Sequence, residues 1–125
     1  MYSPQLLDHF QHPRNAGDLP AADAQARVEN PVCGDVLEVA IRVDGDRIEA
    51  IGFRAKGCVP AMACGSAMTE LAKGKSVLEA RTISRDDIEA AVGDLPPASG
   101  HAAQLAIDAL QMVLRQIGRR PANLP

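Results

Sequence analysis

The amino-acid sequence predicts an α+β fold in which a small antiparallel sheet of about three strands packs against helices on one of its faces. Two patterns lead to this prediction. Alternating apolar and polar residues on either side of a turn near Gly45 indicate a β-hairpin, and apolar residues at helical spacing cover nearly all of the chain after Cys58. The length of 125 residues suits a single domain, which we expect to span residues 1–125.

The chain is expected to open with a short amphipathic helix that Ser3 caps and that the pair His12-Pro13 ends. Residues 14–32 are rich in Ala, Asp, Gly and Pro, and they are predicted to be mostly loop. Within this loop, residues 26–28 fit a short edge strand.

Two strands form the predicted hairpin, at residues 36–43 and 47–56. The turn between them consists either of residues 44–45 or of residues 45–46. In the second strand the alternation of apolar residues slips near Gly52, which predicts a β-bulge or a strong local twist there.

The remaining helices are predicted from caps and apolar stripes. A long helix begins near Pro60, two short helices are capped by Ser76 and Ser84, and a last helix spans residues 101–117. Each of the two serines precedes an acidic residue by three positions, which is the pattern of a capping box.

Composition excludes several classes of function. The 13 basic and 16 acidic residues give a net charge of −3, and with two Phe, one Tyr and no Trp we expect no nucleic-acid binding. No apolar run approaches the roughly 20 residues of a membrane-spanning helix, so we expect no membrane insertion. The odd number of cysteines and the absence of a signal-peptide pattern predict a cytoplasmic protein with reduced thiols.

Two cysteines and an aspartate are predicted to meet at one end of the sheet. In either hairpin register Cys33 lies opposite a residue between positions 56 and 58, which brings Cys33, Asp35 and Cys58 together. Two thiolates beside a carboxylate suit zinc or iron, and Gly34 and Gly57 let the backbone bend around an ion. The alternative is a buried thiol beside a turn aspartate, with no metal.

Three short motifs occur in an order that resembles a known family. They are Pro31-Val32-Cys33-Gly34-Asp35-Val36, Lys56-Gly57-Cys58, and Leu95-Pro96-Pro97 ahead of His101. With the opening helix and the stretch Met68-Thr69-Glu70, they make nearly the whole chain similar to the IscU/NifU N-terminal scaffold family. The resemblance implies a non-enzymatic scaffold that assembles a [2Fe–2S] cluster, can hold zinc at the same site and passes the cluster to recipient apoproteins.

The resemblance also implies ligands and partners. The cluster ligands of the family correspond here to Cys33, Asp35, Cys58 and His101, and a cysteine desulfurase is the expected partner. A homodimer that shares one cluster is physically reasonable, because each chain supplies only two thiolates. His9 and His12 are interpreted as a helix-surface and a helix-end residue, not as ligands.

The sequence departs from the family pattern at two places. Ala102 stands where the family has its third cysteine, the usual persulfide acceptor, which leaves the sulfur chemistry open. Cys64 could replace it, but its place in the apolar stripe of the long helix favours a buried core residue. The continuation of the Leu-Pro-Pro motif as Ala98-Ser99 lacks the lysine of the family's chaperone-recognition segment, so a chaperone interaction is doubtful.

Three functions therefore compete at this point. The leading one is a scaffold that binds a [2Fe–2S] cluster or zinc. The second is a zinc-binding relative that modulates a cysteine desulfurase without building clusters, which Ala102 favours. A metal-dependent enzyme ranks last, because four protein ligands close a tetrahedral ion and leave no position for water.

Overall fold

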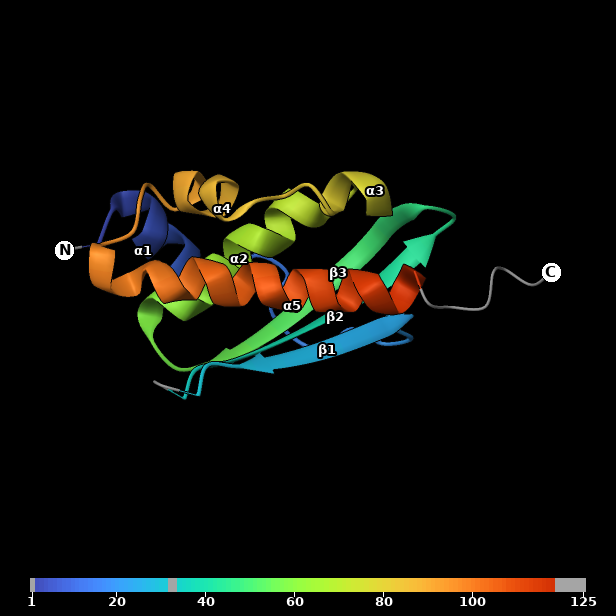
Figure 1. Ribbon diagram of the computed structural model, residues 1–125, viewed down its shortest axis with the longest axis horizontal. Coiled ribbons are helices and arrows are strands. Elements are labelled where there is room, and N and C mark those ends of the chain that lie inside the picture. Colours follow the sequence, from blue (N-terminus) through green and yellow to red (C-terminus); the bar gives the residue numbers. More distant parts are fainter. Residues whose placement is uncertain (1, 32–33, 119–125) are drawn as a thin grey trace.

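The structure is a computed structural model, which describes residues 2–31 and 34–118. Its sheet has three antiparallel strands, β1 (Ala24–Glu29), β2 (Val36–Asp44) and β3 (Arg47–Lys56), in the order β1-β2-β3. The strands of the hairpin and the short edge strand are therefore confirmed, the latter with longer bounds than expected. The predicted α+β fold is confirmed as well (Figure 1).

The helices lie on one side of the sheet, as Figure 1 shows. The central helix α2 packs against β3, and α5 runs across β1 and β2 beside it. Within the described residues, no helix combines the length and the apolar character that crossing a bilayer requires. The helical elements, with a short 3₁₀ turn η1 before the last of them, are α1 (Pro4–Gln11), α2 (Val59–Ala72), α3 (Val77–Ala80), α4 (Arg85–Ala91), η1 (Pro97–Ser99) and α5 (Gly100–Gly118).

The register of the β2–β3 hairpin determines which residues meet at its open end. Asp44 pairs with Arg47, so the turn consists of residues 45–46, the second of the two predicted alternatives. The register then shifts by one at Glu49, which has no partner in the ladder, as in a β-bulge. Beyond the bulge the pairing is regular as far as the last pair of the ladder, Val36 with Lys56.

The irregularity predicted at Gly52 is misplaced, because Gly52 pairs regularly with Ala40. The apolar alternation slips because of the bulge at Glu49, which puts Ile48 and Ile51 on the same core-facing side although they are three residues apart. At Gly52 residues 15–19 also cover the strand from the other side. The Phe53 N–H donates to the Asn15 carbonyl, at 3.0 Å, and a Cβ at position 52 would lie only 2.8 Å from the Gly17 carbonyl oxygen. Both faces of the sheet are buried at Gly52, so Gly52 and its neighbours in the strand on either face are small or apolar.

Small residues let α2 lie close to the sheet. A Cβ at Gly65 would come within 2.9 Å of the Phe53 ring, so this helix position admits only glycine at the observed spacing. Cys64 is fully buried beside it, which agrees with its interpretation as a core residue. Burial, together with the nearby Cys58 thiol, raises the pKa of Cys64 to about 12, so the thiol stays protonated.

His9 lies in the interface between α1 and α2, where it is 5% exposed, so its interpretation as a surface residue is wrong. Its Nδ1 lies 2.7 Å from the hydroxyl of Ser66, and the Arg14 backbone N–H donates to the same hydroxyl at 2.9 Å. The other ring nitrogen, Nε2, lies 3.6 Å from the Glu70 carboxylate.

This buried imidazole predicts a loss of stability in mild acid. Burial lowers the pKa of His9 below its usual value of 6.5, and Arg14 adds to the effect while Glu70 and Asp8 oppose it. In mild acid the His9 imidazole therefore binds a proton more readily in the unfolded chain than in the folded chain. As the pH falls below about 6.5, the free energy of unfolding should decrease by up to about 1.4 kcal/mol per pH unit from this group.

Urea unfolding between pH 7.5 and pH 5 measures this effect. In His9→Gln the contribution should be absent, whereas His12→Gln, an exposed control at the end of the same helix, should keep it. An unchanged pH dependence in His9→Gln would show that other groups cause the acid sensitivity.

Candidate metal centre

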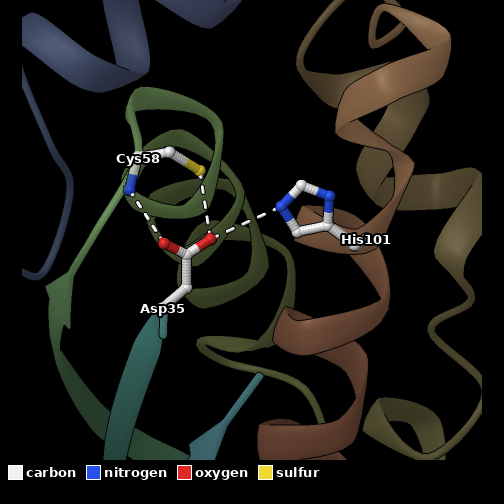
Figure 2. A group of neighbouring side chains, drawn as sticks. All are labelled: Asp35, Cys58 and His101. Atoms are coloured by element: carbon white, nitrogen blue, oxygen red, sulfur yellow. Dashed lines mark hydrogen bonds and ion pairs between the residues drawn. The ribbon is translucent and has the colours of Figure 1, made fainter. Parts of the chain in front are cut away.

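Three side chains from distant parts of the sequence converge at the open end of the hairpin (Figure 2). Asp35 directly precedes β2, and Cys58 follows β3 as the N-cap residue of α2. Because the hairpin register places the start of β2 opposite the end of β3, both residues emerge at the same end of the sheet. His101, near the start of α5, points toward them from the helix layer.

Asp35 is the centre of the group. Its carboxylate accepts the Cys58 backbone N–H at Oδ1, at 3.1 Å, and the Cys58 thiol at Oδ2, at 3.2 Å. The Nε2 atom of His101 lies 3.4 Å from the same Oδ2. Asp35 is 3% exposed, whereas Cys58 and His101 are half-buried.

Gly57 makes room for this carboxylate. Its φ of +142° favours glycine, and a Cβ there would lie only 2.0 Å from Oδ1 of Asp35. Gly34 also has a positive φ, of +76°, but a Cβ at that position would meet nothing within 4 Å. The sequence indicated that both glycines serve a bend, but it gave no sign that only Gly57 touches a candidate ligand.

The three donor atoms suit a single metal ion. The Sγ of Cys58, a carboxylate oxygen of Asp35 and a ring nitrogen of His101 all lie within 4.8 Å of one another. The observed S···O and N···O distances of 3.2 and 3.4 Å are close to the roughly 3.3–3.6 Å edges of a tetrahedral zinc site. Among the described residues Nε2 of His101 has no hydrogen-bond partner although it is buried, so its lone pair can serve a metal ion.

The structure thus brings together three of the four residues that the sequence singled out, namely Asp35, Cys58 and His101. Cys33 lies outside the described residues, and its part in the site stays a prediction. Cys64 belongs to the core, and Ala102, next to His101, is buried at 1% exposure.

The fold and this mixed sulfur, oxygen and nitrogen donor set define a small α+β protein with a candidate metal site at the end of its sheet. Residues 1–123 match the family of the NifU-like N terminal domain. The chain therefore belongs to this family.

Individual relatives agree with this assignment. The iron–sulfur cluster assembly scaffold protein IscU 1 of Archaeoglobus fulgidus is 46% identical over 124 residues, which are 99% of this chain and 81% of that protein. The IscU scaffold protein of Aquifex aeolicus is 36% identical over 116 residues, 91% of this chain and 74% of that protein. The crystal structure of a nitrogen-fixing NifU-like protein (N-terminal) from Brucella abortus has the same fold, with a TM-score of 0.79 at 18% identity over 95% of both chains.

The two glycines beside the site provide a test of its geometry. Gly57→Ala must displace the Asp35 carboxylate as well as strain the backbone, whereas Gly34→Ala strains the backbone alone. We expect Gly57→Ala to lower the free energy of unfolding by roughly 2–4 kcal/mol and Gly34→Ala by about 1 kcal/mol. Chemical unfolding of the metal-free proteins measures both. Equal losses would mean that the contact between residue 57 and Asp35 is not made in solution.

Proposed function

We propose that this chain is an iron–sulfur cluster assembly scaffold, not an enzyme, that holds a [2Fe–2S] cluster as cargo through Cys33, Asp35, Cys58 and His101. The observation that carries the proposal is the convergence of Asp35, Cys58 and His101 at the end of the sheet, in a chain of the NifU-like N-terminal family. Zinc would occupy the same donors when no cluster is present.

The chemistry of the donors suits a cluster that is held and then released. Oxygen and nitrogen ligands bind iron less tightly than thiolates do, so a site with Asp35 and His101 gives up its iron more readily than four cysteines would. Cys58 lies at the N-terminus of α2, where the positive end of the helix dipole favours a thiolate. Its thiol contacts Asp35 and makes no capping bond to the helix, so its sulfur can turn to a metal.

The partners follow from this role. We infer that a cysteine desulfurase supplies sulfur and that apoproteins accept the finished cluster, in the cytoplasm. The second proline of the Leu-Pro-Pro motif begins the short turn η1, and no lysine follows the motif there, so we propose no chaperone contact. A zinc-binding relative that modulates the desulfurase is the second candidate, because Ala102 has no sulfur to accept a persulfide.

The site predicts metal binding with a defined stoichiometry. Purified protein should bind about one zinc per chain, and the double variant Cys33→Ser/Cys58→Ser should bind none, since serine is a poor zinc ligand. Cys64→Ser is the matched control, because Cys64 is fully buried in the core and should not affect the stoichiometry. Elemental analysis after gel filtration measures the content.

Zinc should also stabilise the fold, because the donors from the hairpin and from α5 meet only in the native state. Chelation should therefore lower the melting temperature of the parent and leave that of the double variant unchanged. Full metal content in the double variant would place the site elsewhere in the molecule.

Restoring the third cysteine separates the two candidate functions. Ala102→Cys adds a thiolate beside His101, so a reconstituted [2Fe–2S] cluster should last at least several-fold longer in this variant than in the parent. Anaerobic reconstitution followed by the decay of visible absorption, with Cys64→Ser as a further arm, measures the lifetimes.

The parent protein decides between scaffold and zinc-binding relative. Acid-labile sulfide in anaerobically purified parent protein supports the scaffold. Zinc without sulfide, combined with no cluster formation on reconstitution, would exclude the scaffold and leave the zinc-binding relative. A long-lived parent cluster that Cys64→Ser destroys would show that Cys64 has taken the role of the missing cysteine.

A further inference from the structure

Within residues 2–31 and 34–118, the strand β1 leaves one edge of the sheet largely uncovered. It is one of the two outer strands in the order β1-β2-β3, and Figure 1 shows it along the border of the molecule with α5 above it. The main chain of Gln25 is bonded on this outer edge by the side chain of Gln116 at the end of α5, which both accepts the Gln25 N–H and donates to the Gln25 carbonyl. Among the described residues, the side chains of α5 therefore bond the main chain of this edge at Gln25 alone.

The alternation of the ladder identifies the open groups. In antiparallel strands, the main-chain groups of successive residues point alternately toward and away from the neighbouring strand. The outward bonds of Gln25, and the Asn30 N–H that donates to the Asp35 carbonyl on the β2 side, fix this phase. Arg27 and Glu29 therefore point their N–H and C=O groups outward, and no hydrogen bond to these groups is found within residues 2–31 and 34–118.

The open edge of β1 is complementary to the same edge of a second copy of the chain. Arg27 and Glu29 also carry opposite charges on the outer face of the sheet, where they form an exposed ion pair at 3.9 Å with side chains that are 59% and 52% exposed. If two copies pair their β1 edges antiparallel, Arg27 can lie opposite Glu29 of the partner subunit, and the reverse, about an axis at Val28. This register joins outward groups to outward groups, and it places unlike charges opposite each other twice.

Neighbouring registers are disfavoured on physical grounds. A shift by two residues either way places Arg27 opposite Arg27 of the partner subunit, or Glu29 opposite Glu29 of the partner subunit, and like charges across a ladder repel. Continuation of the ladder is limited because Gln25 is already bonded by Gln116 and Pro31 has no N–H to donate.

Apolar side chains lie where the second copy would cover them. Val28 is only partly buried, on the face of β1 that packs against the core. Met112, one turn before Gln116 and on the same side of α5, is 37% exposed. An edge-to-edge pair would remove part of both side chains from water, which adds an apolar contribution to the main-chain bonds.

We propose that this chain forms a homodimer by antiparallel pairing of β1 with β1 of a second copy, with Arg27 opposite Glu29 of the partner subunit. The sheet becomes continuous across two chains. Because the candidate metal site lies beyond residue 30 in each chain, antiparallel pairing places the two sites at opposite ends of the joined strands. This dimer needs no metal and differs from one held together by a shared cluster.

Charge reversal tests the register directly, by sedimentation equilibrium of the full chain in the presence of a chelator. The parent should associate, and both Arg27→Glu and Glu29→Arg should weaken association about tenfold, because each turns two attractive pairs into repulsive ones. A mixture of these two variants should associate like the parent, since every Glu then faces an Arg. The double variant Arg27→Glu/Glu29→Arg should also recover.

Two controls keep the test specific. Arg54→Glu makes the same charge change on an exposed residue of β3, away from the open edge, and should leave association unchanged. Cys58→Ser should leave it unchanged as well, because the dimer does not depend on the metal site. Amide hydrogen exchange of Arg27 and Glu29 should slow as the protein concentration rises.

Several outcomes would overturn the proposal. These are a parent that stays monomeric at all concentrations, variants that do not recover when mixed, and association that chelation or Cys58→Ser abolishes. Association with unprotected amides at Arg27 and Glu29 would mean that the two copies meet on another surface.

Discussion

The contact between the Asp35 carboxylate and the main chain of residues 57–58 joins the two ends of the hairpin, and much of the structure depends on it. The carboxylate is almost fully buried, and it is held there by the Cys58 N–H and by the space that Gly57 leaves. A buried carboxylate without partners would be strongly unfavourable, so these two residues make the site possible before any metal arrives. The start of α2 is positioned by the same bond, since Cys58 is its N-cap residue.

Helix α5 serves both ends of the molecule. Near its first turn it presents His101 to the site, and near its last turn Gln116 is bonded to the edge of the sheet at Gln25. Between these points its apolar side packs against β1, β2 and α2. A displacement of the helix along the sheet would therefore alter the edge and the donor set together.

Much of the fold could be predicted because it is encoded locally. The alternation of apolar and polar residues predicted the two hairpin strands, and the serine caps predicted α3 and α4. The hairpin register alone brought Asp35 near Cys58, since both lie a few residues from paired strand ends. His101 could be assigned only through the family resemblance, because its position depends on how α5 packs and not on any local pattern.

The errors have the same physical origin. The bulge is predicted near Gly52 and not at Glu49 because residues 15–19, distant in sequence, bury the strand from its other side at Gly52, and His9 looked exposed because its partner Ser66 lies on another helix. No local pattern reports a contact that a distant segment makes. The bulge at Glu49 shifts the apolar alternation, since Ile48 and Ile51 face the same side of the sheet although they are three residues apart, but the exposed extra residue gives no sign of its own position.

That bulge also has a consequence for how the sequence can vary. The side chains of a strand alternate between two faces, so a deletion or insertion of one residue in the regular ladder between Ala50 and Cys58 would rotate the thiol away from Asp35, whereas loss of the extra residue Glu49 would only remove the bulge. Substitutions along the exposed face of the hairpin leave this phase intact. The length of the hairpin therefore determines where the thiol lies. Among proteins that keep this site, we expect the length of the hairpin to vary less than its residues.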